Sequence, residues 1–138
     1  LMVIGLYSLL RGVQPKETND WFLASYVDAV DWVTTPNVIG MSQFADGGLM
    51  ASKPYTATGA YINRMSNYCK GCQYNPKESV GPNACPFTTL YWSFLDRHRE
   101  RLSNNHRMSM QLKNLQRIDD QKLTAIRKAA NSLLHQSS

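Results

Sequence analysis

The 138-residue sequence predicts an all-α fold. Apolar residues recur at helical spacing in several segments, and no segment alternates between polar and apolar residues for long. Hydrophobic residues make up 43% of the chain and charged residues 18%, as in ordinary globular domains. At this length we expect one domain with a buried core and no internal repeat.

The first two predicted helices lie on either side of Gly12. Apolar residues at helical spacing predict a helix that begins near residue 2, and Gly12 is placed to end it in the left-handed conformation. Pro15 suits the first turn of a second helix, which we expect to continue to about Trp32. Residues 34–35 precede Pro36, and the residue before a proline favours extended backbone.

Residues 33–60 are rich in glycine, proline and small polar residues, so we expect a long irregular loop with a functional role. Beyond it we predict a short helix at about 60–69, a cysteine loop at about 66–86 and C-terminal helices over about 87–134. Two of these helices are expected at about 86–102 and 119–134. A short frayed tail is expected after His135.

The chain begins at Leu1 in the middle of an apolar pattern, so we expect it to be a piece of a longer protein. This apolar run is ten residues long, whereas a membrane-spanning helix needs about 20. We therefore expect no membrane partner. Fifteen Lys and Arg against ten Asp and Glu give a net charge of +5, which suits a polyanionic partner and an ordinary basic protein equally well.

Three cysteines, Cys69, Cys72 and Cys85, have the spacing C-x2-C-x12-C. Their odd number and the C-x2-C pair favour metal or redox chemistry in a reducing, cytoplasmic compartment over disulfides. Zinc, an iron–sulfur cluster, and redox or structural thiols all remain open from the spacing. A zinc site would need His98 or His106 as its fourth ligand, although the arginines beside His98 favour a solvent-facing histidine.

Aromatic and acidic side chains gather immediately before the predicted loop. Trp21 and Trp32 flank Asp28 and Asp31, an arrangement that favours a site for a planar cofactor. For any single aromatic ring, packing in the core is the alternative. For the two carboxylates, which are three residues apart, the alternatives are acid–base chemistry, a salt bridge to arginine, or a hydrogen bond from a bound ring.

Two long segments resemble the C-terminal part of the bacterial iron–sulfur cryptochromes and photolyases, also called deoxyribodipyrimidine photolyase-related proteins or prokaryotic (6-4) photolyases. The segments are "WFLASYVDAVDWVTTPNVIGMSQFADGG" and "SKPYTATGAYINRMSNYCKGCQYNPKESVGPNACPFTTLYWSFLDRHRERL". The resemblance covers nearly all of the chain from Leu1 to about Arg107, and the remaining residues are less distinctive.

This resemblance implies a two-domain flavoprotein with an N-terminal antenna domain, absent from this chain, and a helical domain that binds FAD and a 4Fe-4S cluster. It implies an enzyme, a light-dependent carbon–carbon lyase, in which reduced FAD donates an electron to a (6-4) pyrimidine photoproduct flipped out of DNA. The expected partners are damaged DNA and the N-terminal remainder of the same protein. Residues 1–138 would be the C-terminal portion of the FAD-binding domain, and this piece alone is not expected to repair DNA.

Site residues follow from the same resemblance, position by position. Cys69, Cys72 and Cys85 match three of the four cluster ligands, and the fourth is expected upstream of Leu1. Trp21 matches an electron-transfer tryptophan, and Phe22 stands where some relatives have a tyrosine, so a phenol relay at that position is in doubt. The other matches are the flavin-binding stretch (Asp28, Asp31, Asn37 and Met41) and the segment facing the lesion and DNA (Lys53, Tyr55 and Tyr61), with Tyr55 expected to contact the lesion directly.

Two other functions remain open from the sequence. The parent protein could be a cryptochrome-type blue-light photoreceptor, because receptors and repair enzymes share the flavin scaffold. Alternatively, the chain could be a small zinc-stabilised module that binds nucleic acid through the basic stretch from Arg97 to Arg107. This second alternative leaves the tryptophan and carboxylate cluster unexplained.

Overall fold

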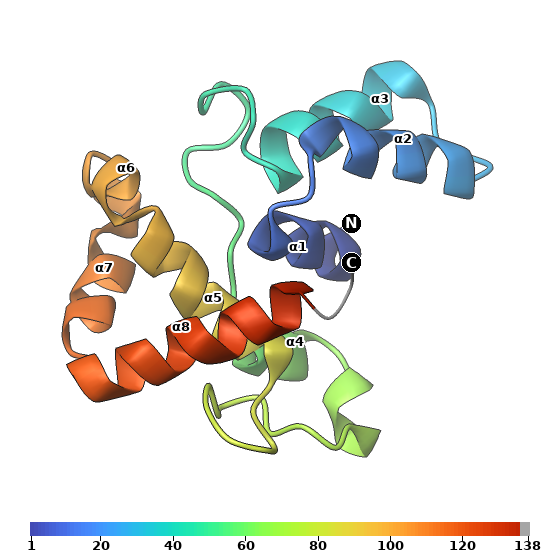
Figure 1. Cartoon of the computed structure of the whole chain (residues 1–138). Coiled ribbons are helices and arrows are strands. Elements are labelled where there is room, and N and C mark those ends of the chain that lie inside the picture. The colour runs from blue at the N-terminus through green and yellow to red at the C-terminus, as the bar shows by residue number, and fades with distance from the viewer. Residues whose placement is uncertain (136–138) are drawn as a thin grey trace. The chain divides into compact units, whose positions relative to one another are not determined.

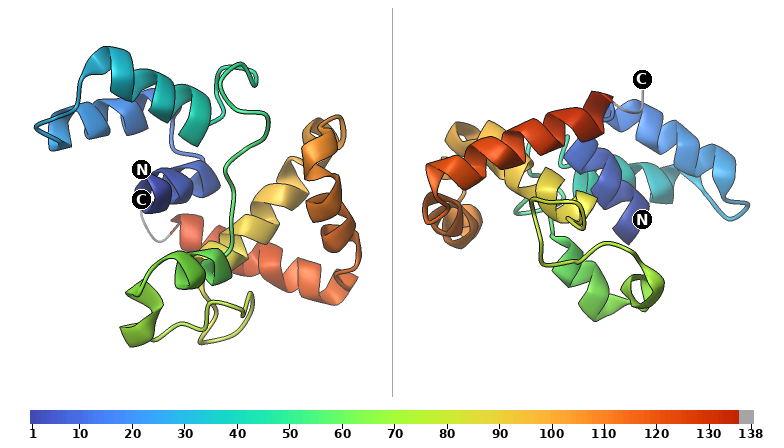
Figure 2. Two further views of the ribbon diagram at one scale, coloured as in Figure 1. Left: turned by 180° about the vertical axis from the view of Figure 1, so that it is seen from behind. Right: turned by 60° about the horizontal axis from the view of Figure 1, so that its bottom comes forward.

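The computed structural model describes residues 1–135 as two compact units, one comprising residues 1–56 and the other beginning at Ala57 (Figures 1 and 2). Both units are built from helices, and no strand occurs between residues 1 and 135, so the predicted all-α class is confirmed. The tail expected after His135 lies outside the described residues. None of the helices in residues 1–135 is both long and apolar enough to cross a membrane.

Four helical segments form the first unit: α1 (Met2–Arg11), α2 (Pro15–Ser25), α3 (Asp31–Thr35) and the π-helical segment η1 (Pro36–Ser42). Both α1 and α2 pack against η1, and α2 also packs against α3. The buried apolar side chains of this core include Leu6, Leu10, Phe22 and Val38. Burial of such side chains against neighbouring helices supplies most of the stability of short helices like these.

The predicted end of the first helix is confirmed. Gly12 adopts the left-handed conformation (φ 74°, ψ 31°). Its N–H donates to the carbonyl oxygen of Leu9 at 3.1 Å, and the N–H of Val13 donates to that of Ser8 at 3.0 Å. These two bonds satisfy carbonyl groups that the end of α1 would otherwise leave without partners. Pro15 also stands at the first position of α2, as predicted.

The prediction that the second helix continues to Trp32 is wrong. The helix ends at Ser25, Tyr26 is extended (φ −113°, ψ 126°), and a new helix, α3, begins at Asp31. Aromatic and β-branched residues in this stretch lose side-chain freedom in a helix. Val27, at the turn between the two helices, is fully exposed, so no packing opposes the break.

The prediction of extended backbone before Pro36 is also wrong. Thr35 is helical (φ −59°, ψ −48°), and the helix widens at Pro36 into the π-helical segment η1. Proline has no N–H to donate, and a wider turn can accommodate it inside a helical stretch. The N–H of Gln43 accordingly reaches the carbonyl of Val38, five residues back, at 2.8 Å. The irregular segment therefore covers residues 43–58 and not 33–60.

Five helices and two short 3₁₀ turns form the described part of the second unit: α4 (Gly59–Met65), η2 (Tyr68–Gly71), α5 (Pro86–Arg97), α6 (Arg99–Ser103), η3 (His106–Met108), α7 (Ser109–Gln116) and α8 (Asp120–His135). Both α7 and α8 pack against α5 (Figures 1 and 2). The core of this unit includes Leu90, Leu95, Leu115 and Ile126.

The predictions for the second unit are right for helices whose start is signalled by a proline or by acidic residues, and whose apolar residues recur at helical spacing. Pro86 begins α5 as predicted, and α8 begins one residue after the predicted start. The single helix expected over residues 86–102 is wrong, because the backbone of His98 (φ −106°, ψ 15°) separates α5 from α6. Helix α7 falls within the predicted helical region of about 87–134 but was not predicted as a separate helix, because only two of its residues, Leu112 and Leu115, are buried.

Asp96, near the end of α5, joins three helices. Its carboxylate accepts hydrogen bonds from Nε and Nη2 of Arg127 on α8, at 2.6 and 3.0 Å, and from Nη2 of Arg99 on α6, at 2.8 Å. The Asp96 side chain is 9% exposed. The bond from Arg127, followed by that from Arg99, lowers the pKa of Asp96 below its usual value, against the opposing effect of burial.

We expect replacement of Asp96 by asparagine to lower the free energy of unfolding by about 1 kcal/mol at neutral pH. Because the folded pKa of Asp96 lies below the unfolded value of 3.8, ionised Asp96 stabilises the fold above that value, and the effect is lost as the pH falls through the folded pKa. Urea unfolding across the pH range should show a constant difference between wild type and variant above about pH 5, and a difference that shrinks as the pH falls below the unfolded pKa. A difference that persists in acid would mean that charge is not the cause.

Candidate functional site

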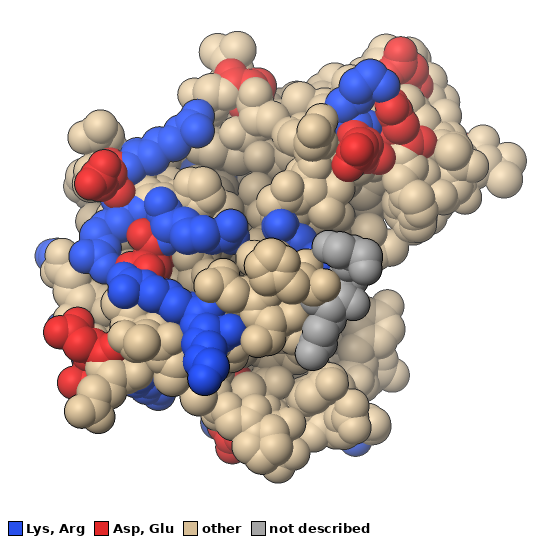
Figure 3. Space-filling model, viewed as in Figure 1, with Lys and Arg blue, Asp and Glu red and all other residues tan. Residues whose placement is uncertain are grey.

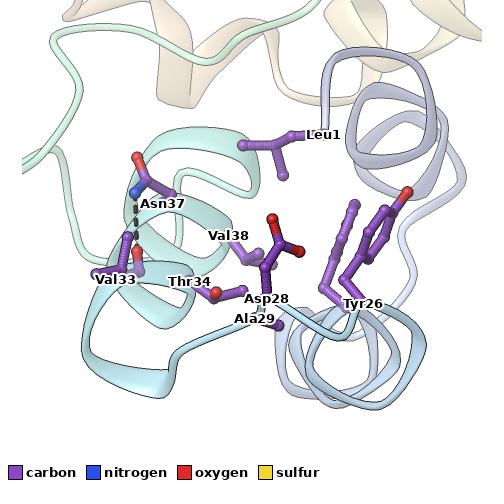
Figure 4. A pocket seen from close by; sticks show the side chains of 9 residues that line it. Leu1, Tyr26, Asp28, Ala29, Val33, Thr34, Asn37 and Val38 are labelled. Carbon is purple, nitrogen blue, oxygen red and sulfur yellow. Dashed lines mark hydrogen bonds between the residues drawn. The ribbon is translucent and has the colours of Figure 1, made fainter.

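A cavity of about 340 Å³ opens in the first unit, among α2, the turn after it, α3 and η1. Figure 4 shows it from close by. Its volume is near the lower end of those seen for small-molecule sites. Nine residues line it: Leu1, Phe22, Tyr26, Asp28, Ala29, Val33, Thr34, Asn37 and Val38.

The cavity brings together two of the four predicted flavin-binding residues, Asp28 and Asn37. The Asp28 carboxylate projects into the space below Leu1 (Figure 4). The amide nitrogen of Asn37 donates to the carbonyl oxygen of Val33 at 2.8 Å, which leaves the amide oxygen as an acceptor. Asp28 lies in the turn after the end of α2, and Asn37 lies in η1. The site is therefore formed by two backbone features that were predicted wrongly, the break after α2 and the helical turn at Pro36.

The other two predicted flavin-binding residues do not line the cavity. Asp31, at the start of α3, accepts a hydrogen bond from the Thr35 hydroxyl one turn later. Met41 lies half-buried in η1. The cavity thus presents one carboxylate and one side-chain amide among apolar and aromatic walls, a combination that suits a planar heterocyclic ring with N–H donors.

Three aromatic rings from α2 and the residue after it form a cluster at one wall. Phe22 and Tyr26 stack with ring centroids 5.7 Å apart and an interplanar angle of 17°. Trp21 meets both rings edge-on, at 5.2 Å from Phe22 and 6.2 Å from Tyr26. Trp21 itself is 47% exposed. Tyr26 was not predicted as a site residue, although its position four residues after Phe22 was the available signal.

The predicted lesion-facing residues are divided between the two units. Tyr55, which is 56% exposed, and the half-buried Lys53 belong to the irregular segment of the first unit. Tyr61 lies on α4 in the second unit, and the guanidinium of Arg64 lies 5.7 Å from the centre of its ring. Earlier in the irregular segment, Asp46 accepts the N–H groups of Gly48 and Met50, and these bonds lower its pKa.

The three cysteines lie in one region of the second unit. Cys69 is in the η2 turn, Cys72 directly follows that turn, and Cys85 directly precedes α5. All three are free thiols: Cys85 is buried, Cys69 half-buried and Cys72 exposed. Burial raises the pKa of Cys69, and the nearby Cys85 and Cys72 raise it further. In residues 1–135 no three Cys, His, Asp or Glu side chains are arranged to hold a single metal ion.

The cysteine loop is fastened to the first turn of α5 by two threonine hydroxyls. Oγ1 of Thr88 donates to the Pro76 carbonyl at 2.8 Å, and Oγ1 of Thr89 donates to the Ser79 carbonyl at 2.8 Å. The Thr88 oxygen also accepts the N–H of Gly59, at the start of α4, at 3.0 Å. One buried hydroxyl therefore links the loop, α4 and α5.

Gly59 also belongs to this region, although it was not predicted as a site residue. A Cβ atom added to it would lie 2.5 Å from the sulfur of Cys85 and 3.2 Å from backbone atoms of Pro76. Only a glycine allows α4 to approach the loop this closely. No local signal marks it, because the reason for the glycine is a residue that lies 26 positions away in the chain.

The histidine considered as a zinc ligand packs elsewhere. The ring of His98 lies 4.6 Å from that of Phe94, centroid to centroid. Burial lowers the pKa of His98, and the positive charges of Arg97 and Arg101 lower it further. His106, the other candidate, is exposed in η3.

Comparison with known proteins gives two relatives. A (6-4) photolyase from Agrobacterium fabrum is 59% identical over 109 residues, which cover 79% of this chain and 22% of that protein. An uncharacterized protein from Acanthamoeba polyphaga mimivirus is 33% identical over 94 residues, 68% of this chain and 69% of that protein. No protein-family model matches the chain. The chain thus spans about a fifth of the photolyase it resembles.

Proposed function

This chain belongs to the photolyase family, and from that premise we propose that it is the C-terminal portion of the helical FAD-binding domain of a light-driven DNA photolyase. The parent enzyme would repair (6-4) pyrimidine photoproducts, with its antenna domain and the rest of the FAD site in other parts of the protein. The observation that carries this proposal is the 59% identity over 109 residues to a (6-4) photolyase. So high an identity over most of this chain favours a shared reaction.

We propose that the cavity of the first unit holds part of the FAD. Asp28 would accept an N–H of the ring system and fix its orientation, and Asn37 would contribute its amide oxygen. Asp31 and Met41 would lie around the same group. Bound FAD would supply the light-driven electron transfer, and this chain would supply position and exclusion of water.

Trp21 is the proposed electron-transfer residue. The partly exposed indole contacts Phe22 and Tyr26 edge-on, so it lies beside the cavity in a fixed aromatic environment. Lys53, Tyr55 and Tyr61 are proposed to face damaged DNA. The exposure of Tyr55 supports a direct contact with the lesion.

We propose that Cys69, Cys72 and Cys85 hold a 4Fe-4S cluster together with a fourth cysteine outside this chain. Three free thiols on one loop are the donor set that such a cluster takes. Cys72 and Cys85 both act on the pKa of Cys69, so the three thiols lie near one another, as the ligands of one cluster must.

The test uses the full-length protein, prepared without oxygen. We expect bound flavin, iron and acid-labile sulfide, and loss of a (6-4) photoproduct from duplex DNA in blue light but not in darkness. Replacing Tyr55 by phenylalanine should reduce repair while leaving the flavin spectrum unchanged. Flavin and iron without repair would favour a photoreceptor, and stoichiometric zinc with neither would favour the nucleic-acid-binding module.

A further inference from the structure

The positive charge of the chain is carried by the second unit. Its sequence from residue 57 onward contains twelve Lys and Arg against five Asp and Glu, a formal charge of +7, whereas residues 1–56 contain three against five, or −2. Nine of the twelve lie between Arg97 and Lys128, and all nine are exposed. Figure 3 shows Lys and Arg gathered in a band over α5, α6 and α8.

Within this band, Asp96 holds two arginines in place. The side chains of Arg99 and Arg127 remain 49% and 52% exposed. A guanidinium has five N–H donors, and Asp96 accepts two from Arg127 and one from Arg99. Most of the donors are therefore left for an acceptor outside the chain. Two exposed side chains that would otherwise sample many rotamers are already ordered.

Lys128 extends this positive group along α8. It follows Arg127 in the sequence, and the turn of the helix directs it further from the α5–α8 contact. We call Arg99, Asp96, Arg127 and Lys128 the basic clamp. Its net charge is +2 even with Asp96 ionised, and Asp120, at the start of α8, also acts on Arg127.

We infer that the basic clamp is a contact surface for the phosphate backbone of duplex DNA. The inference rests on the proposed function, which supplies DNA as the partner. Guanidinium groups match the geometry of phosphate oxygens, and backbone contacts of this kind position a protein without reading sequence. The clamp would serve to hold the duplex, whatever the lesion.

The surroundings of the clamp favour phosphate over an acidic protein surface. Protein interfaces depend on buried aromatic or apolar anchors at their centre. In residues 1–135 the large hydrophobic residues that are exposed include none on α5, α6 or α8. A positive surface without such anchors suits a partner bound through charge, and a duplex is the densest regular array of negative charge available.

The test compares two double variants of the full-length protein. One, Arg99→Gln/Lys128→Gln, removes two positive charges from the clamp. The other, Lys16→Gln/Lys77→Gln, removes two exposed positive charges from α2 and the cysteine loop. Fluorescence anisotropy in the dark measures binding to an undamaged duplex over a range of salt concentrations. Circular dichroism and flavin content verify that each variant is folded.

For the clamp variant we expect the slope of log K against log salt to become shallower by about 2, and the affinity at about 0.1 M salt to fall about tenfold or more. The control variant should keep the wild-type slope. Equal changes in both variants would show that only net charge acts, and would overturn the inference. No change in the clamp variant would overturn it as well.

Two further measurements distinguish duplex DNA from an acidic protein as the partner, and the clamp from the proposed repair function. If the clamp variant keeps duplex binding but loses binding to polyglutamate, the surface takes an acidic protein and the inference fails. Repair in light is measured on the same samples. Absence of repair in the wild type, together with the expected change in slope, would reject the proposed function alone, and repair without that change would reject the clamp alone.

Discussion

Replacing Gly59 by alanine is expected to lower the free energy of unfolding by about 2–3 kcal/mol and, on the proposal that Cys85 binds a cluster, to reduce the iron content of the full-length protein. The added methyl group would meet the Cys85 sulfur at 2.5 Å and backbone atoms of Pro76 at 3.2 Å. The loop cannot simply retreat, because Thr88 and Thr89 fasten it to α5. Chemical denaturation and iron analysis are the two measurements.

The matched control for this substitution is Gly71→Ala. It makes the same chemical change in the cysteine loop itself, at a glycine where an added Cβ would meet no atom within 4 Å and where φ is not positive. We expect its effect to stay within about 0.5 kcal/mol. Restriction of the unfolded chain by the added methyl group would by itself stabilise both variants. If both lose equal stability, the close approach of α4 to the cysteine loop is not the cause, because only position 59 makes that approach.

Leu95→Ala is expected to lower the free energy of unfolding by about 3–4 kcal/mol. Leu95 has no exposed surface and belongs to α5, against which α7 and α8 pack. Removing its methyl groups leaves a cavity that the surrounding helices can fill only in part. Urea unfolding of the full-length protein, followed by circular dichroism, measures the loss.

Met110→Ala provides the comparison for Leu95→Ala. Met110 lies on α7 and is 68% exposed, so its truncation removes apolar atoms without opening a cavity. We expect a change within about 0.5 kcal/mol. A loss below about 1 kcal/mol for Leu95→Ala would contradict the close packing of α5 in this core.

Features of the fold that depend on neighbouring residues could be predicted from the sequence. Gly12 ends α1, Pro15 opens α2 and Pro86 opens α5, because each acts through its own backbone geometry. The cysteines could be assigned to one loop for the same reason, since their spacing is local.

Other features depend on contacts that the sequence does not reveal. The helical period predicts no break after Ser25, and the usual behaviour of proline predicts no wide helical turn at Pro36. Tertiary packing around Phe22 and Val38 compensates for both irregularities. Asp28 and Asn37 line the same cavity because of those two irregularities. The candidate site could therefore be predicted in its residue types but not in its arrangement.

The bond between Gly59 and Thr88 has a consequence for the exchange of amide hydrogens with solvent. Amides in the first turn of a helix have no partner within the helix, and most of them exchange rapidly with water. The Gly59 N–H instead donates to the buried oxygen of Thr88. It can exchange only when α4 moves away from Thr88 on α5, so its rate of deuterium uptake reports how often that contact opens.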